Sequence, residues 1–250
     1  ESEIEIIRAA DFIEWGGEEA RRISSRMFAA RDRDAKVLIE HSPIGVVAAF
    51  TPWNYPVLQP SKKFAALLAA GCSCVIKPAE ETPASTNALL QCFIDSGLPP
   101  NVVNLVYGEP SKISSFLIAD ERIRKITFTG SVPVGKILAA EAGKHMKPVT
   151  MELGGHSPVL VFPDVDLETV TDILVARKFA NSSQVCVAPN RFFVHEEIID
   201  NFIEMFCQKA SAIKIGDGTD PDVNMGPMAN QRRIKAMEWL VKDAVLRGAK

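Results

Sequence analysis

The middle of the chain alternates between short apolar runs and amphipathic segments, and this alternation limits the possible folds more than any other feature. Apolar runs at 44–50, 73–76, 102–106, 125–128 and 149–153 predict strands, and the segments at 57–70, 84–96, 111–119 and 132–143 predict the helices between them. Strands that alternate with helices in this way form parallel sheets covered by helices. We therefore expect an α/β fold with a doubly wound parallel sheet.

Further elements are predicted on both sides of this region. Apolar residues at helical spacing predict an amphipathic helix over 11–30, and Val37–Ile39 reads as a short strand. After Gly155 the pattern restarts, with strands at 158–162 and 191–194 and helices at 166–180 and 197–210. We expect a first domain over 1–155 and a second α/β domain that begins near 156.

Polar residues follow several of the predicted strands. Trp53 and Asn54 lie in a proline-stiffened loop, Lys77 and Glu80 follow the next strand, and Gly130 with Ser131 follows the strand at 125–128. In open parallel sheets, ligands bind at the carboxyl ends of the strands. These side chains are therefore expected to converge on one crevice.

Two of these loops have features that suit a nucleotide. A lysine at Lys77 can donate to ribose hydroxyls, while a carboxylate at Glu80 can accept from a 2′-hydroxyl and would repel a 2′-phosphate, which favours NAD over NADP. The alternative is a solvated surface pair. Gly130 allows backbone to approach a ligand, and free amides at the start of the next helix, beside Ser131, favour an anion. The alternative is a turn that only connects two elements.

Three other residues could carry chemistry. Cys186 stands among small and polar neighbours and could be a nucleophile, although free cysteines are more often buried structural thiols. Glu152 ends a predicted strand between apolar neighbours, where a partly desolvated carboxylate could act as a general base or form a buried ion pair. Asn54 could donate to an oxyanion or simply form a turn.

Composition argues against several classes of protein. The formal net charge is −3 and the basic residues are scattered, which argues against a nucleic-acid-binding face. The five cysteines lack paired spacing and the four histidines lie far apart, so we expect no metal site and free thiols in a reducing compartment. The apolar runs are too short to span a bilayer, and the first residues lack the apolar core of a signal peptide. We expect a soluble cytoplasmic protein.

The motifs occur together and in a specific order. They are Thr51–Pro56, Lys77–Glu80, Phe128–Ser131, Met151–Gly155 and the loop around Cys186, whose cysteine follows Glu152 by 34 positions. With this set the whole chain resembles the NAD(P)-dependent aldehyde dehydrogenase superfamily, including its succinate-semialdehyde dehydrogenases. The resemblance implies a Rossmann-like cofactor domain followed by part of a catalytic domain.

The resemblance also implies a role for each motif. Cys186 would attack the aldehyde carbon, Asn54 and the Cys186 backbone N–H would hold the oxyanion, and Glu152 would activate the water that hydrolyses the thioester. Lys63 matches a family lysine near this base and is a candidate proton-relay residue. The residues expected to contact NAD are Trp53, Lys77, Glu80, Gly130, Ser131 and Leu153.

The resemblance further implies a homodimer or homotetramer, with residues 24–43 as the arm that pairs subunits. Because family members are longer at both ends, and a later Glu-x-Phe-Gly-Pro motif is absent, we expect an internal fragment. Its parts would be an NAD-binding domain over 1–155 and the N-terminal part of a catalytic domain over 156–250.

Two positions depart from the family pattern. Ser183 stands where the family usually has glycine, and Lys62 stands where succinate-semialdehyde dehydrogenases typically have arginine. Two alternative functions stay open, and Ser183 together with the missing later motif motivates the first of them. The protein could be a catalytically idle binding or structural protein on the same fold, or a relative that passes the acyl group to coenzyme A.

Overall fold

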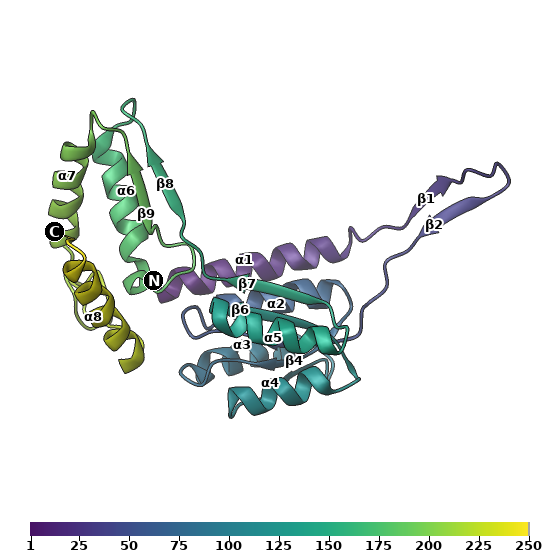
Figure 1. The fold of residues 1–250 in the computed structure, drawn as a ribbon. Helices are drawn as coiled ribbons and strands as arrows, with labels where there is room; N and C mark the ends of the chain where they lie inside the picture. The colour runs from purple at the N-terminus through teal and green to yellow at the C-terminus, as the bar shows by residue number, and fades with distance from the viewer. Residues whose placement is uncertain (250) are drawn as a thin grey trace. The chain divides into compact units, whose positions relative to one another are not determined.

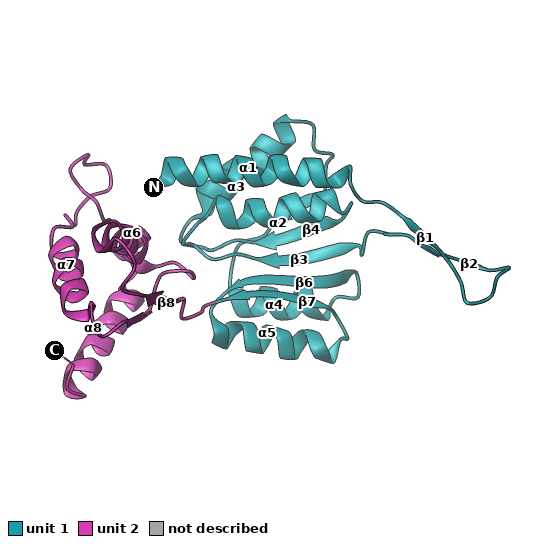
Figure 2. Ribbon diagram, turned by 90° about the horizontal axis from the view of Figure 1, so that it is seen from above, with its two compact units in different colours: residues 1–153 teal, residues 154–250 magenta. Residues whose placement is uncertain are grey.

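The computed structural model describes residues 1–249, and this part of the chain divides after Leu153 into two compact units (Figures 1 and 2). The first unit contains a large sheet and the second a smaller one. Each unit is described by itself.

A five-stranded sheet forms the centre of the first unit. Its strands are β3 (Val46–Phe50), β4 (Ser73–Lys77), β5 (Val103–Leu105), β6 (Ile123–Gly130) and β7 (Val149–Leu153). They lie in the order β5-β4-β3-β6-β7, and each neighbouring pair is parallel. The predicted doubly wound parallel sheet is thus confirmed. The strand order reverses direction between β3 and β6, which is the switch point where such sheets bind ligands.

Helices cover both faces of this sheet (Figure 2). On one face α2 (Leu58–Ala69) and α3 (Pro83–Asp95) pack on a core that includes Val47 and Ala49. On the other, α4 (Pro110–Ala119) and α5 (Val132–Lys144) pack on a core that includes Ala48 and Phe50. Since side chains alternate along a strand, β3 is apolar throughout because both of its faces are buried.

A long N-terminal helix, α1 (Ser2–Ala20), packs against α2. The two helices approach closely at Gly16, where an added Cβ would lie 2.8 Å from the Ala65 Cβ. The predicted helix over 11–30 was wrong at both ends, since α1 begins at Ser2 and stops at Ala20. Residues 26–29 fit the helical period, but they form a strand because they pair with residues 36–39.

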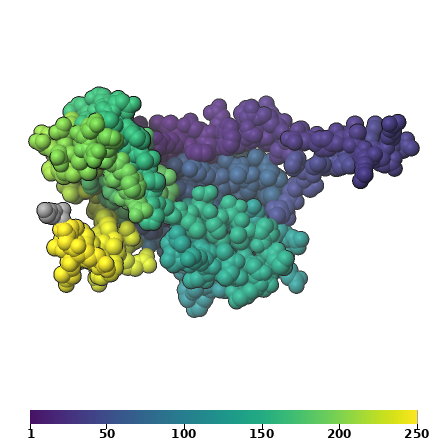
Figure 3. Space-filling view, turned by 45° about the horizontal axis from the view of Figure 1, so that its top comes forward, coloured from purple at the N-terminus to yellow at the C-terminus, as the bar shows by residue number. Residues whose placement is uncertain are grey.

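That pairing forms a two-stranded antiparallel hairpin of β1 (Arg26–Ala29) and β2 (Lys36–Ile39). In Figure 3 the hairpin extends from the body of the first unit, and every residue of both strands is exposed. Met27 faces Leu38 across the pair, so apolar side chains lie next to one another in water.

The second unit has a small parallel sheet of β8 (Pro158–Val161) and β9 (Arg191–Val194), with α6 (Leu167–Phe179) between them and α7 (Ile199–Ser211) after them. Val161, Leu174 and Phe202 form its core, with Phe192 and Phe206 packed against them. Asp166 caps α6, because its carboxylate accepts a bond from the Glu168 N–H at 3.2 Å. The last helix is α8 (Gln231–Leu246). In the part of the chain described here, no helix combines the length and the apolar composition that crossing a membrane requires.

Candidate active site

The loops at the carboxyl edge of the sheet meet at the switch point. Phe50, the last residue of β3, pairs with Lys77 on one side and Phe128 on the other. The loop that carries Trp53 and Asn54 therefore begins between the ends of β4 and β6, and the Thr51 N–H donates to the Lys77 carbonyl at 3.3 Å. These loops therefore share one edge of the sheet.

Lys77 and Glu80 form an ion pair at this edge. The Lys77 side chain is 7% exposed and its Nζ also donates to the Pro78 carbonyl at 3.0 Å, whereas the Glu80 side chain is 43% exposed. A solvated surface pair is therefore the wrong description for Lys77. Tyr107 lies nearby, and burial together with the Glu80 charge raises its pKa. The Glu80 carboxylate remains accessible to solvent.

The turn between β6 and α5 carries Gly130 and Ser131. Ser131 is the N-cap of α5, but its side chain makes no cap hydrogen bond to the N–H groups of the first turn. Packing also favours glycine at position 130, because a Cβ there would collide with the Phe128 ring. Leu153 lies against the first turns of α5, since a Cβ on Gly135 would be 2.6 Å from Leu153 Cδ2.

Lys63 reaches from α2 to the sheet. It is 8% exposed, and its Nζ donates to Thr127 Oγ1 at 2.8 Å. Burial lowers the pKa of Lys63 to about 8, against the opposing effects of Cys74 and Glu152. The Glu152 charge thus acts on Lys63 and favours its ammonium form. The expected partial burial of Glu152 was wrong, because its side chain is exposed.

Cys186 lies in the second unit in a tight turn, closed by a bond from the Ala188 N–H to the Val185 carbonyl at 3.1 Å. Its side chain is exposed, whereas Cys72 and Cys74 are buried. The alternative of a buried structural thiol is therefore wrong for Cys186. Among the described cysteines, Cys92 and Cys207 are also exposed.

The backbone before Cys186 is unusual. Asn181, Ser182 and Ser183 have φ angles of 48°, 54° and 60°, in the left-handed region that favours glycine. Ser183 thus adopts the conformation for which the family's glycine is suited, and does so with a Cβ.

Side-chain hydrogen bonds hold this loop to a later segment of the same unit. Ser182 Oγ donates to the Gly226 carbonyl at 2.5 Å. Gln184 is buried; its Oε1 accepts from the Ala229 N–H at 3.0 Å, and its Nε2 donates to the Asn181 carbonyl at 3.0 Å. The path of the chain into Cys186 is therefore fixed from residues 226–229.

The far end of the loop is fixed by Asn190. Its N–H donates to the His156 carbonyl at 3.3 Å, and its Oδ1 accepts from Lys178 Nζ at 3.0 Å. Both ends of the turn that exposes Cys186 are thus anchored within the second unit.

Sequence reasoning missed the contact that Thr127 makes in the first unit and the anchoring contacts that Ser182 and Gln184 make in the second. Thr127 had a usable signal, since Thr127 and Thr129 alternate with Ile126 and Phe128 and so share one face of a strand. Ser182 and Gln184 had none, because their partners lie 44 and 45 positions away.

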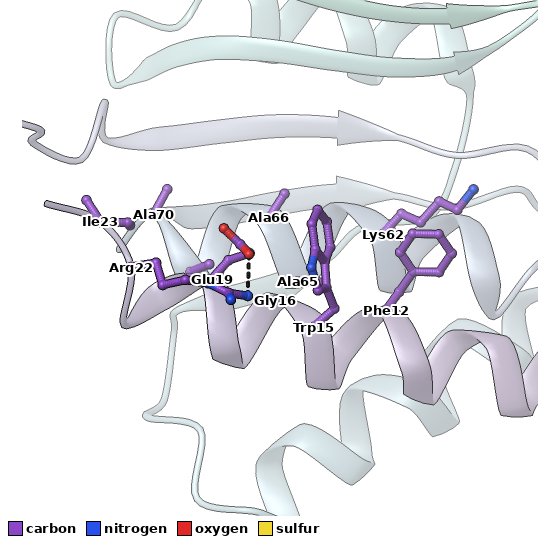
Figure 4. Close-up of a pocket in the computed structure, with 11 residues that line it drawn as sticks. Phe12, Trp15, Gly16, Glu19, Arg22, Ile23, Lys62, Ala65, Ala66 and Ala70 are labelled. Atoms are coloured by element: carbon purple, nitrogen blue, oxygen red, sulfur yellow. Dashed lines mark ion pairs between the residues drawn. The ribbon is translucent and has the colours of Figure 1, made fainter.

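A cavity of about 420 Å³ lies elsewhere, between α1 and α2 (Figure 4). Lys62 lines it, with its Nζ 4.6 Å from the centre of the Phe12 ring. Lys62 therefore faces α1, while the next residue, Lys63, faces the sheet. The cavity contains none of the predicted catalytic residues. Within the described residues, no three His, Cys, Asp or Glu side chains gather as metal ligands would.

A parallel sheet in this order, with polar loops at its switch point, defines a Rossmann-like α/β protein. The aldehyde dehydrogenase family model matches residues 1–250, and the chain belongs to that family. This confirms the resemblance drawn from the ordered motifs.

Relatives and solved structures agree. A 4-(hydroxymethyl)benzenesulfonate dehydrogenase of Comamonas testosteroni is 44% identical over 250 residues, all of this chain and 52% of that protein. A succinate semialdehyde dehydrogenase of Acinetobacter baylyi is 40% identical over 245 residues, 98% of this chain and 51% of that one. The crystal structure of an Escherichia coli NADP-dependent enzyme superposes with a TM-score of 0.96 at 39% identity, over 98% of this chain and 51% of that chain. The chain spans about half the length of these relatives.

Proposed function

We propose that the full-length protein oxidises an aldehyde to a carboxylic acid with NAD(P), and that Cys186 is its nucleophile. The observation that carries this proposal is the exposed Cys186 thiol on a loop anchored at both ends, in a chain of the aldehyde dehydrogenase family. A thiolate suits the reaction because it adds to a carbonyl carbon and later leaves readily from a thioester.

Each site residue has one task in this scheme. Cys186 Sγ bonds to the aldehyde carbon, and the Asn54 amide with the Cys186 N–H stabilises the oxyanion of the thiohemiacetal. NAD(P), when bound, supplies the acceptor for the hydride that leaves this carbon. Glu152 takes a proton from the water that attacks the resulting thioester, with Lys63 behind it as a proton relay. Lys77, Glu80 and Ser131 hold the cofactor, with Trp53, Gly130 and Leu153 alongside.

For the cofactor we propose NAD in preference to NADP. The support is the exposed Glu80 carboxylate at the sheet edge, which would repel a 2′-phosphate. The similar Escherichia coli structure is of an NADP-dependent enzyme, so rates with the two cofactors must be compared directly.

For the substrate we propose an aldehyde that also carries a sulfonate or carboxylate group. The names of the two relatives above contain a benzenesulfonate and succinate semialdehyde, and both are anions. An uncharged aldehyde of similar size should therefore be oxidised more slowly than its anionic counterpart.

We further propose a homodimer or homotetramer in which residues 24–43 pair subunits, supported by the exposed apolar hairpin. A cytoplasmic location is proposed from the free cysteines, which suit a reducing compartment.

The test is NADH or NADPH formation by the full-length protein with a panel of anionic and neutral aldehydes. Cys186→Ala should abolish turnover, while Cys92→Ala, which removes another exposed thiol, should retain it. Turnover by Cys186→Ala at the parent rate would remove Cys186 from its role.

The same assay separates the alternatives. A parent protein that forms no reduced cofactor with any aldehyde would support the idle binding protein. Acyl-CoA that accumulates when coenzyme A is added would support the acyl-transferring relative.

A further inference from the structure

The side chains that face α2 from the sheet include a row of polar groups under Lys63. On β6, Ile126 and Phe128 lie in the core that packs on α4 and α5. Thr127 and Thr129 must therefore face the opposite side, where Lys63 Nζ bonds to Thr127 Oγ1 at 2.8 Å.

Strand register extends this row to Glu152. Thr129 on β6 is the partner of Glu152 on β7, and paired residues of neighbouring strands lie on the same face. Thr127, Thr129 and Glu152 therefore share the α2 face, and Thr127 lies two residues before Thr129, the strand partner of the proposed base Glu152.

Two titratable groups act on Lys63 from the sheet, Cys74 on β4 and Glu152 on β7. Burial raises the pKa of Cys74 to about 12, so the thiol stays neutral where Lys63 titrates, near a pKa of about 8. Glu152 is thus the neighbour whose charge favours the Lys63 ammonium.

We infer that Thr127 is a positioning residue that holds the Lys63 amine where it can take the proton from Glu152. This inference rests on the proposed function. In the deacylation step, water oxygen bonds to the thioester carbon, Glu152 takes its proton, and the C–S bond breaks to return the Cys186 thiolate. The Glu152 proton then passes to neutral Lys63, which becomes an ammonium and leaves Glu152 ionised.

Thr127→Val tests this by removing the oxygen that accepts from Lys63 while it keeps the shape of the side chain. Thr127→Ser keeps the hydroxyl and should retain the parent rate of acyl-enzyme decay. The control is Thr150→Val. Thr150 is the β7 partner of Thr127, so this substitution removes a threonine hydroxyl one strand away. The readout is acyl-enzyme decay by rapid quench across a pH series, with cofactor reduction measured separately.

We expect Thr127→Val to slow decay about tenfold, a part of what general acid–base groups contribute, with little change in cofactor reduction. Decay should rise with pH as Lys63 becomes neutral. The midpoint should move to lower pH in Thr127→Val, because an acceptor that favours the ammonium is gone. Two results would overturn the inference. One is an equal loss of rate in cofactor reduction and in acyl-enzyme decay that Thr127→Ser does not restore. The other is a Thr127→Val variant whose decay depends on pH as it does in the parent protein.

If the unsubstituted protein forms no acyl-enzyme, the proposed function is wrong. The effect of Thr127 on Lys63 is then tested by a second measurement. Trace acetylation of lysines across the same pH series, followed by mass spectrometry, reports the Lys63 midpoint without catalysis. A lower midpoint in Thr127→Val but not in Thr127→Ser supports the placement, and equal midpoints in all three proteins refute it.

Discussion

At the scale of single residues, the loop before Cys186 combines backbone strain with side-chain anchors. A residue other than glycine, asparagine or aspartate costs on the order of 1 to 2 kcal/mol in the left-handed region, and here Ser182 and Ser183 both adopt it directly after Asn181. Strain of this kind persists only where surrounding contacts impose it. The bonds from Ser182 to Gly226 and from Gln184 to Ala229 are such contacts.

Ser183→Gly should therefore stabilise the protein by about 1 kcal/mol, because glycine adopts a φ of 60° without a Cβ penalty. Ser183→Ala is the matched control; it keeps the Cβ and should give no such gain. Urea unfolding of both variants and the parent measures the difference. A less stable Ser183→Gly would mean that the serine side chain contributes more than its backbone costs.

At the scale of elements, a carboxylate on α1 caps the N-terminal end of α2. Glu5 Oε1 accepts from the backbone N–H groups of Val57 and Leu58 at 2.7 and 2.9 Å. N–H groups at the start of a helix have no acceptor within that helix. A carboxylate there also interacts favourably with the positive end of the helix dipole. The loop that carries Asn54 ends at this cap, so α1 helps to fix the end of that loop.

Glu5→Ala should lower the free energy of unfolding by about 1 kcal/mol, the usual cost of a lost helix cap. Glu3→Ala provides the control, since Glu3 is exposed on the same helix. Thermal unfolding followed by circular dichroism compares the two. Equal losses in both variants would show that general helix charge, rather than the cap, is responsible.

Local patterns predict some features of this molecule and not others. The sheet was predictable because β3 is apolar along its whole length and its helices keep a clear period. The end of α1 was not, because Met27 fits both a helix and a strand, and pairing with Leu38 decides between them. The exposure of Glu152 was also missed, because β7 lies at the edge of the sheet and one edge is unpaired.

The candidate site divides in the same way. Lys77 and Glu80 are close in sequence, so their pairing follows from local geometry. The anchors of the Cys186 loop depend on partners far along the chain, and tertiary structure alone reveals them.

At the scale of the whole molecule, we expect the hairpin of β1 and β2 to need a partner that covers its apolar side chains. Two-stranded hairpins are marginal in water, and this one exposes 65% of Met27 and 59% of Leu38. Exposed strand edges and apolar patches favour pairing with another chain. This supports the proposed role of residues 24–43 in assembly.

Leu38→Asp should shift the full-length protein toward monomers, because a carboxylate would be buried without a partner in the interface. Arg33→Asp places the same side chain in the turn, outside both strands, and should leave assembly intact. Sedimentation velocity at several concentrations resolves the species. An unchanged mass for Leu38→Asp would exclude the hairpin as the pairing element.

The central place of β3 has a consequence for synthesis. One side of this strand pairs with β4 soon after it emerges, but its other partner is β6, at Ile123–Gly130. At typical elongation rates the second edge of β3 stays open for on the order of 5 to 15 seconds. During that interval a wholly apolar strand has a free row of backbone groups, so the nascent chain is most exposed to aggregation before residue 130 is made. A chaperone that shields residues 46–50 at that stage would raise the yield of folded protein.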